Sequence, residues 1–152
     1  MIHLAKRAKL EQLSLAGSRI GGNSLAHLAK LDKLTVLDLS STSITDNTLR
    51  NHIASRTGLR ALGLRNTGVT SGGMKHLKPL KQLEDLWLAR TAISNNGLAQ
   101  LPTLQSLRTL DLSRTRIDNT ARNQLKNFQQ LKSLDLSGTL FTSTAVADLS
   151  AE

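Results

Sequence analysis

Leucines alternate with polar residues in short stretches that return along the chain at an almost constant interval. The motif Leu-x-x-Leu-x-Leu begins six times, at Leu10, Leu34, Leu59, Leu83, Leu107 and Leu131. Successive copies begin 24, 25, 24, 24 and 24 residues apart. Six copies in near-constant register indicate a repeated architecture rather than one irregular core.

The first half of each repeat predicts a strand and the second half predicts a short helix. Alternate residues of the motif point the same way, so each repeat supplies one short strand with its leucines inward. Strands that recur every 24 residues can pair only in parallel, which requires a crossover connection. Apolar residues at three-residue spacing, such as Leu25, Leu28 and Leu31, suit a crossover made of a short helix or 3-10 turn. Capping residues stand where these segments should begin, at Thr45-Asp46, Thr70-Ser71, Ser94-Asn95 and Asp118-Asn119.

A column of hydroxyl residues stands where the chain leaves each strand: Ser18, Thr42, Thr67, Thr91, Thr115 and Thr139. We expect each hydroxyl to hydrogen-bond backbone groups of the adjacent turns. With these columns, the chain resembles the leucine-rich-repeat family over almost its whole length, in a bacterial-type variant with Thr where many members have Asn. The resemblance implies an α/β solenoid, a right-handed horseshoe with a parallel β-sheet on its concave face and short helices or 3-10 turns on its convex face. It says little about function.

We expect residues 1–152 to form a single domain of six repeats, with residues 1–9 as the end of a preceding partial repeat. A solenoid needs polar caps over its terminal layers, and no separate capping module is visible. Three interpretations remain open: the charged residues Lys6, Arg7 and Lys9 cap the first layer, the chain is a piece of a longer protein, or uncapped ends associate end to end. We favour the piece of a longer protein.

Composition narrows the class of protein. The formal net charge is +9, aromatic residues make up 2% of the chain, and cysteine is absent. The absence of cysteine excludes disulfide-capped architecture and cysteine-ligated zinc. We see no signal peptide and no stretch near the ~18 apolar residues of a membrane span. These features favour a soluble protein that is cytoplasmic rather than secreted.

Strand residues that alternate with the inward leucines should form the concave face, where such solenoids bind partners. Trp87 is the only tryptophan and stands in an outward position of the fourth strand, in surroundings typical of an interface hot spot. The alternative is that its ring lies flat across Gly63, a neighbour without a side chain. The predicted partner-binding residues are Trp87, Asp85, Arg65, Arg90, Asp111, Asp135 and Arg114.

Two columns of the repeat contain residues that could bind a metal ion, one of aspartates and one of histidines. Asp38, Asp111 and Asp135 share an outward column, and strands ~4.8 Å apart would place the last two within reach of one cation. No further ligand converges on them, so a solvated polar face is the preferred interpretation. The histidine column, at His3, His27, His52 and His76, lies on turns too far apart to share one ~2.1 Å coordination shell. We predict no metal, no cofactor and no catalytic residue, and therefore a protein that is not an enzyme.

Positive charge gathers on the loops that lead into the strands. These positions hold Lys6, Lys9, Lys30, Lys33, Arg56, Lys78, Lys81 and Lys126, with Arg60, Arg108 and Lys132 just beyond. Such an edge attracts nucleic acid, anionic lipid or an acidic protein, but no aromatic residues are interleaved to stack on bases. The sequence therefore predicts a scaffold that binds a protein partner on its concave face. The alternative is an anion or nucleic-acid binder that works through the basic loop edge.

Overall fold

A computed structural model describes residues 9–101 and 104–145, and the strands in these ranges form one sheet. The strands are β1 (Gln12–Ser14), β2 (Val36–Asp38), β3 (Ala61–Gly63), β4 (Asp85–Trp87), β5 (Thr109–Asp111) and β6 (Ser133–Asp135). They are parallel and follow one another in chain order. Equivalent leucines pair in register, as Leu62 of β3 does with Leu86 of β4. The predicted parallel strand in each repeat is confirmed.

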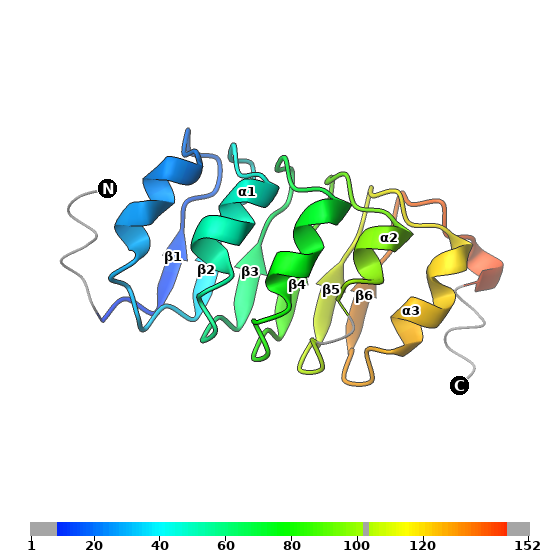
Figure 1. Cartoon of the computed structure of the whole chain (residues 1–152). Helices are drawn as coiled ribbons and strands as arrows, with labels where there is room; N and C mark the ends of the chain where they lie inside the picture. Colours follow the sequence, from blue (N-terminus) through cyan, green and yellow to red (C-terminus); the bar gives the residue numbers. More distant parts are fainter. Residues whose placement is uncertain (1–8, 102–103, 146–152) are drawn as a thin grey trace.

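Short helical segments return the chain from one strand to the next, and they all cover the same face of the sheet (Figure 1). The 3-10 helices are η2 (Gly22–Leu28), η4 (Ser71–Leu77) and η5 (Asn119–Ala121). The α-helices are α1 (Asp46–Thr48), α2 (Asn95–Leu98) and α3 (Arg122–Lys126), and η3 (Leu49–Ile53) is a π-helix. Short helices and 3-10 turns were predicted for this side, and the structure confirms them.

The predicted capping residues stand at the helix starts. Thr45, Thr70, Ser94 and Asp118 are the N-cap residues of α1, η4, α2 and η5, all with extended backbone. The Thr70 hydroxyl accepts the N–H of Gly72 at 3.2 Å. The Asp118 carboxylate accepts the N–H of Thr120 at 2.9 Å. Each bond satisfies a backbone donor that has no partner inside its helix.

The core is a stack of leucine layers between the sheet and the helices. Leu37, Leu62, Leu86 and Leu110, one from each central strand, are fully buried. Their counterparts in the terminal strands, Leu13 and Leu134, are only half-buried. A layer is buried by its two neighbours, so the layers at the two ends of the described stack are the least covered. Residues 1–8, most of the predicted preceding partial repeat, lie outside the described residues.

The hydroxyl column does not bond to adjacent turns, so that prediction was wrong. The Thr91 hydroxyl donates to the carbonyl of Leu88, three residues earlier in its own turn, at 2.5 Å. The same bond within the turn recurs in the other repeats. The backbone already joins the turns here, as the N–H of Arg90 donates to the carbonyl of Ser113 at 2.9 Å. The hydroxyls therefore pair with the nearest carbonyl of their own strand end.

Side-chain bonds between turns occur instead at the first residue of the helical segments. This column contains Asp46, Ser71, Asn95 and Asn119. The Asp46 carboxylate accepts the backbone N–H of Thr70 at 2.8 Å. The Asn95 side-chain oxygen accepts the N–H of Asp118 at 3.2 Å. Each residue thus pairs a backbone donor of the following repeat and helps to fix the stacking of the repeats.

Candidate interaction surface

A bridge of three side chains lies across the outer face of the sheet, the face turned away from the helices. Trp87 of β4 stands in register between Gly63 of β3 and Asp111 of β5. Arg65 leaves the end of β3, and its guanidinium lies 5.2 Å from the centroid of the Trp87 ring. Its Nε then donates to Oδ2 of Asp111 at 2.8 Å. We call this unit the Arg65–Trp87–Asp111 bridge; it fixes the position of the indole through a cation–π contact and an ion pair.

Asp111 is buried, with 7% of its surface exposed, so the expectation of a solvated carboxylate was wrong for this residue. The backbone N–H of Ser113 donates to its Oδ1 at 3.0 Å and the Ser113 hydroxyl donates to the same atom at 2.7 Å. Burial raises the pKa of Asp111, but the hydrogen bonds from Ser113 and Arg65 outweigh it and hold the pKa below its usual value. The carboxylate is therefore ionised, and both its oxygens are occupied.

The alternative position for the Trp87 ring, flat across Gly63, depends on what lies above that glycine. The space above Gly63 is occupied by the carboxylate of Asp38 and the hydroxyl of Ser40, which are the nearest side-chain atoms to a Cβ built there. A side chain at position 63 would displace Asp38, and this explains the glycine at the end of β3.

The column of aspartates at the strand ends has a structural explanation. Oδ1 of Asp38 accepts the N–H of Ser40 at 3.0 Å, and Oδ1 of Asp135 accepts the N–H of Ser137 at 2.8 Å. Each carboxylate closes the turn that follows its strand, in the manner of an Asx turn. Asp135, unlike Asp111, is exposed. Among the residues that the structure describes, no group of three or more His, Cys, Asp or Glu side chains is placed to hold a metal ion.

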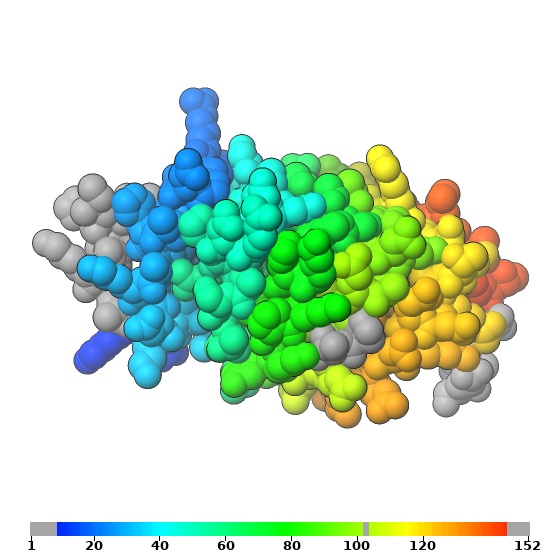
Figure 2. Space-filling view, viewed as in Figure 1, coloured from blue at the N-terminus to red at the C-terminus, as the bar shows by residue number. Residues whose placement is uncertain are grey.

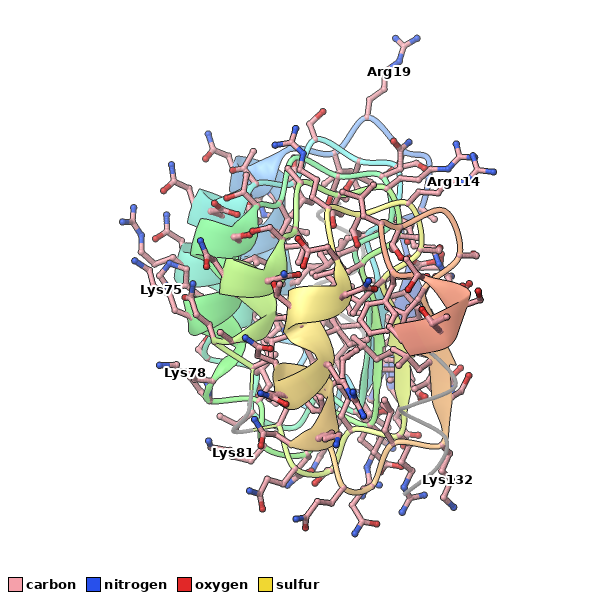
Figure 3. The ribbon with its side chains drawn as sticks, turned by 90° about the vertical axis from the view of Figure 1, so that its right-hand side faces the viewer. Arg19, Lys75, Lys78, Lys81, Arg114 and Lys132 are labelled. Atoms are coloured by element: carbon pink, nitrogen blue, oxygen red, sulfur yellow. The ribbon has the colours of Figure 1, made fainter. Side chains whose placement is uncertain are left out.

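Arg90 and Arg114 stand in a backbone conformation that favours glycine. Their φ angles are 55° and 54°, and the equivalent residues at the two ends of the column are Gly17 at 69° and Gly138 at 68°. Both arginines are exposed. Figure 3 shows Arg114 pointing away from the body of the molecule, at the same edge as Arg19. The two glycines in the column were the sequence signal for this left-handed turn, and sequence reasoning missed it.

The remaining predicted residue, Asp85, is half-buried on β4 in register with Ala61 and Thr109. The structure thus brings Arg65, Trp87 and Asp111 into direct contact. It places Asp85 and Asp135 on the same sheet and Arg90 and Arg114 in the turns that follow β4 and β5.

The basic residues of the loops lie at the edge opposite Arg114. Figure 3 shows Lys81 and Lys132 at this edge, and Lys75 and Lys78 on the side of the helices. Part of the charge at the edge is balanced by Glu84. Its carboxylate lies 2.7 Å from an Arg60 nitrogen and 3.4 Å from an Arg108 nitrogen. Positive charge is therefore present on both edges and on the helical side.

The sequence matches no protein-family model and no curated protein. Solved structures, in contrast, share its architecture. An internalin C2 from Listeria monocytogenes is 25% identical with a TM-score of 0.74, over 93% of this chain and 58% of that one. The leucine-rich-repeat ectodomain of the Arabidopsis thaliana receptor kinase GASSHO1/SCHENGEN3 is 20% identical with a TM-score of 0.64, over 98% of this chain and 18% of that one. The chain has the leucine-rich-repeat fold.

A second internalin, inlF from the same bacterium, is 24% identical with a TM-score of 0.69, and the match covers 99% of this leucine-rich-repeat protein. The chain spans about half the length of the internalins that it resembles, namely 48% of one and 58% of the other. In the part of this leucine-rich-repeat protein that the structure describes, no helix is long and apolar enough to cross a membrane.

Proposed function

We propose that this leucine-rich-repeat protein is a non-catalytic scaffold that binds a protein partner on the concave face of its sheet, with Trp87 at the centre of the contact. The observation that carries the proposal is the Arg65–Trp87–Asp111 bridge. A tryptophan on an outer sheet face is a typical anchor of a protein interface. Because the bridge orders the indole before a partner arrives, little side-chain freedom remains to be lost on binding.

The surrounding residues have different roles in this proposal. Trp87 and Arg65 offer the contact surface, since the Trp87 side chain is half-buried and the Arg65 side chain is 47% exposed. Asp111 has no free oxygen and acts as a positioning residue for Arg65. Arg90, Arg114 and Asp135 are exposed charges at the strand ends, and Asp85 contributes from within the sheet. Charges at the rim of an interface select partners and speed association more than they add affinity.

Two structures with the same architecture contain bound ligands. One is the plant peptide hormone receptor RGFR1 in complex with RGF2, with 17% identity and a TM-score of 0.62. The other is the GASSHO1/SCHENGEN3 ectodomain in complex with CASPARIAN STRIP INTEGRITY FACTOR 2. At these identities only the fold is shared, and the support is that this scaffold serves recognition in both proteins.

The test compares proteins captured from a cell extract by the immobilised chain and by its Trp87→Ala variant, followed by binding measurements with the captured partner. Trp87→Ala should weaken binding by about 2 kcal/mol or more. The control is Leu140→Ala, which removes another large apolar side chain, 71% exposed, from outside the sheet. Trp87 is the only tryptophan, so its fluorescence should change when the partner binds. Equal loss in both variants, or an unchanged fluorescence, would contradict the proposal.

The alternative is an anion or nucleic-acid binder that works through the basic loop edge, where Figure 3 places the exposed residues Lys81 and Lys132. Binding at that edge should fall steeply and linearly on a log–log plot against salt. Charge reversal at Lys78 and Lys81 should then abolish binding while Trp87→Ala has no effect. Binding on the sheet, which depends mainly on desolvated contact, should weaken only modestly with salt.

A further inference from the structure

Two arginines stand in turns whose backbone conformation favours glycine. Arg90 and Arg114 have φ angles of 55° and 54°, and Gly17 and Gly138 hold the equivalent positions at the two ends of the column. Another member of the column, Asn66, belongs to a residue type that tolerates this conformation. Arginine has no such preference, so folding alone does not select it here. A strained residue that the rest of the structure holds in place indicates a function.

The two arginines lie on neighbouring repeats, in the turns that follow β4 and β5. The N–H of Arg90 donates to the carbonyl of Ser113, the residue before Arg114, at 2.9 Å. A Cβ built on Gly138 would lie 3.0 Å from Cγ of Arg114, so a side chain at position 138 would crowd this arginine. The segment after β5, yellow in Figure 2, projects from the upper edge of the molecule, and Figure 3 shows Arg114 at the same edge. Two exposed arginines therefore leave adjacent turns at one edge of the solenoid.

The charges of these two arginines are not compensated within the described part of the chain. No carboxylate there lies within salt-bridge distance of Arg90 or Arg114. The aspartates nearest to Arg114 in the sequence have other partners, since Asp111 binds Arg65 and Asp118 caps η5. Two like charges on adjacent turns also repel one another. An anion bound to both guanidinium groups would supply the missing negative charge and remove this repulsion.

We propose that Arg90 and Arg114 together bind side-chain carboxylates in an acidic segment of the protein partner, and this proposal rests on the proposed function. A partner that covers Trp87 on β4 extends along the same strand towards the turn that holds Arg90. A guanidinium is always charged and matches a carboxylate through two parallel hydrogen bonds. The sheet thus offers the indole as an apolar anchor, and the adjacent edge offers two positive charges.

An acidic protein segment suits this edge better than a nucleic acid does. The outer face of the sheet carries the carboxylates of Asp38, Asp85 and Asp135, which would repel a polyanion that extends across it. A base would need an aromatic ring on which to stack, and the ring of Trp87 already contacts the guanidinium of Arg65, 5.2 Å from its centroid. A short acidic segment needs to reach only the two arginines at the strand ends.

Hexaglutamate with a fluorescent label is a suitable probe, and labelled hexalysine is its cationic counterpart. Fluorescence anisotropy with the full chain at low salt should show binding of hexaglutamate and no binding of hexalysine. The double substitution Arg90→Gly and Arg114→Gly should weaken hexaglutamate binding by roughly tenfold or more. Glycine suits both backbone positions, so the melting temperature of this variant should rise, and unfolding would not explain its loss of binding.

A matched control removes the same charge from other places. The double substitution Arg19→Gln and Lys75→Gln changes two exposed residues, one at the same edge as Arg114 and one on the side of the helices. It should weaken hexaglutamate binding by no more than about twofold, through the lower net charge alone. Equal losses in the two double variants would overturn the proposal, because hexaglutamate would then respond only to net charge.

The remaining arms separate this site from the alternatives. The proposal is also overturned if hexaglutamate does not bind at low salt, or if a thymidine decanucleotide loses more affinity than hexaglutamate does when the two arginines are replaced. Trp87→Ala should leave hexaglutamate binding unchanged, because the probe contacts the arginines and not the indole. A captured partner that is insensitive to Trp87→Ala would contradict the proposed function alone, since the titration of hexaglutamate measures the arginines without any partner.

Discussion

Replacing Arg90 or Arg114 by glycine should stabilise the protein, because each arginine has a left-handed backbone. The φ angles of 55° and 54° are close to those of Gly17 and Gly138 in the same column. A left-handed conformation costs a residue with a Cβ roughly 1–2 kcal/mol, and glycine does not incur this cost. Glycine also has more conformational freedom in the unfolded chain, and this stabilises the unfolded state by about 0.4–1 kcal/mol. The net gain should be about 0.5–1 kcal/mol for each substitution.

Urea denaturation followed by circular dichroism measures this gain. For a chain of this size, 1 kcal/mol corresponds to a shift of about 2–4 °C in melting temperature. The matched control is Arg116→Gly, at the same edge of the solenoid but outside the group of residues with positive φ. Arg116→Gly should lower the free energy of unfolding by about 0.5–1 kcal/mol, because glycine at this position only increases the conformational freedom of the unfolded chain.

Opposite signs at positions 90 and 116 are therefore the expected result. The reasoning is refuted if Arg90→Gly and Arg116→Gly change the free energy of unfolding in the same direction by similar amounts. Under the proposed function, Arg90→Gly and Arg114→Gly should also slow association with the partner, because they remove exposed charges from the turns that follow β4 and β5. A gain in stability together with a loss of binding would indicate that the strained arginines are retained for recognition.

Three further predictions concern the interior, and denaturation measurements check each of them. Thr91→Val should lower the free energy of unfolding by about 1 kcal/mol, because it removes the hydrogen bond to the Leu88 carbonyl. Asn95→Ala should lower it more, by about 1–3 kcal/mol, because the N–H of Asp118 loses its partner. A larger loss for Thr91→Val than for Asn95→Ala would contradict the structure. The pKa of Asp111 is lower in the folded than in the unfolded chain. Its contribution to stability is therefore complete above the unfolded pKa of about 3.9 and is lost as the pH falls through the folded pKa. Asp111→Asn should make the free energy of unfolding fall less steeply with decreasing pH in the acid range. Gly97→Ala should cost about 1–3 kcal/mol, since its Cβ would lie 2.9 Å from the Cα of Ser71, whereas Gly58→Ala, with open space around it, should cost nothing.

The fold could be predicted closely from the sequence because a repeat states the same pattern many times. Leu62 and Leu86 occupy the same place in the motif, and the structure pairs them in register. The capping positions were equally readable, since Thr70 and Asp118 precede their helices at the same distance. Periodicity fixes which residues face inward and where each element begins.

The hydrogen bonds and the bridge could not be predicted in the same way. Thr91 was assigned to the next turn, but its partner depends on which carbonyl the backbone leaves available. The ion pair of Arg65 with Asp111 joins residues 46 positions apart and depends on the rotamer of a long side chain that crosses Trp87. Periodicity carries no information about rotamers. Arg56 stands in a column otherwise held by Leu31, Leu80, Leu104 and Phe128, whereas sequence reasoning counted it only among the basic residues of the loops.

The Arg65–Trp87–Asp111 bridge and the surroundings of Arg56 differ in how far the arginine charge is compensated. At the Arg65–Trp87–Asp111 bridge the charged groups already satisfy one another, so a partner would gain mainly from covering the indole and the flat face of the guanidinium. At Arg56 the guanidinium has a carbonyl partner, and the carboxylate of Asp32 lines a cavity together with it without forming a salt bridge to it. Comparison of equivalent positions within the chain indicates which residue suits the fold best. Leu80 is the equivalent of Arg56, and Gly138 is the equivalent of Arg90. A residue that destabilises the fold, such as Arg90 with its positive φ angle, is therefore a stronger indication of function than an unusual residue that stabilises it.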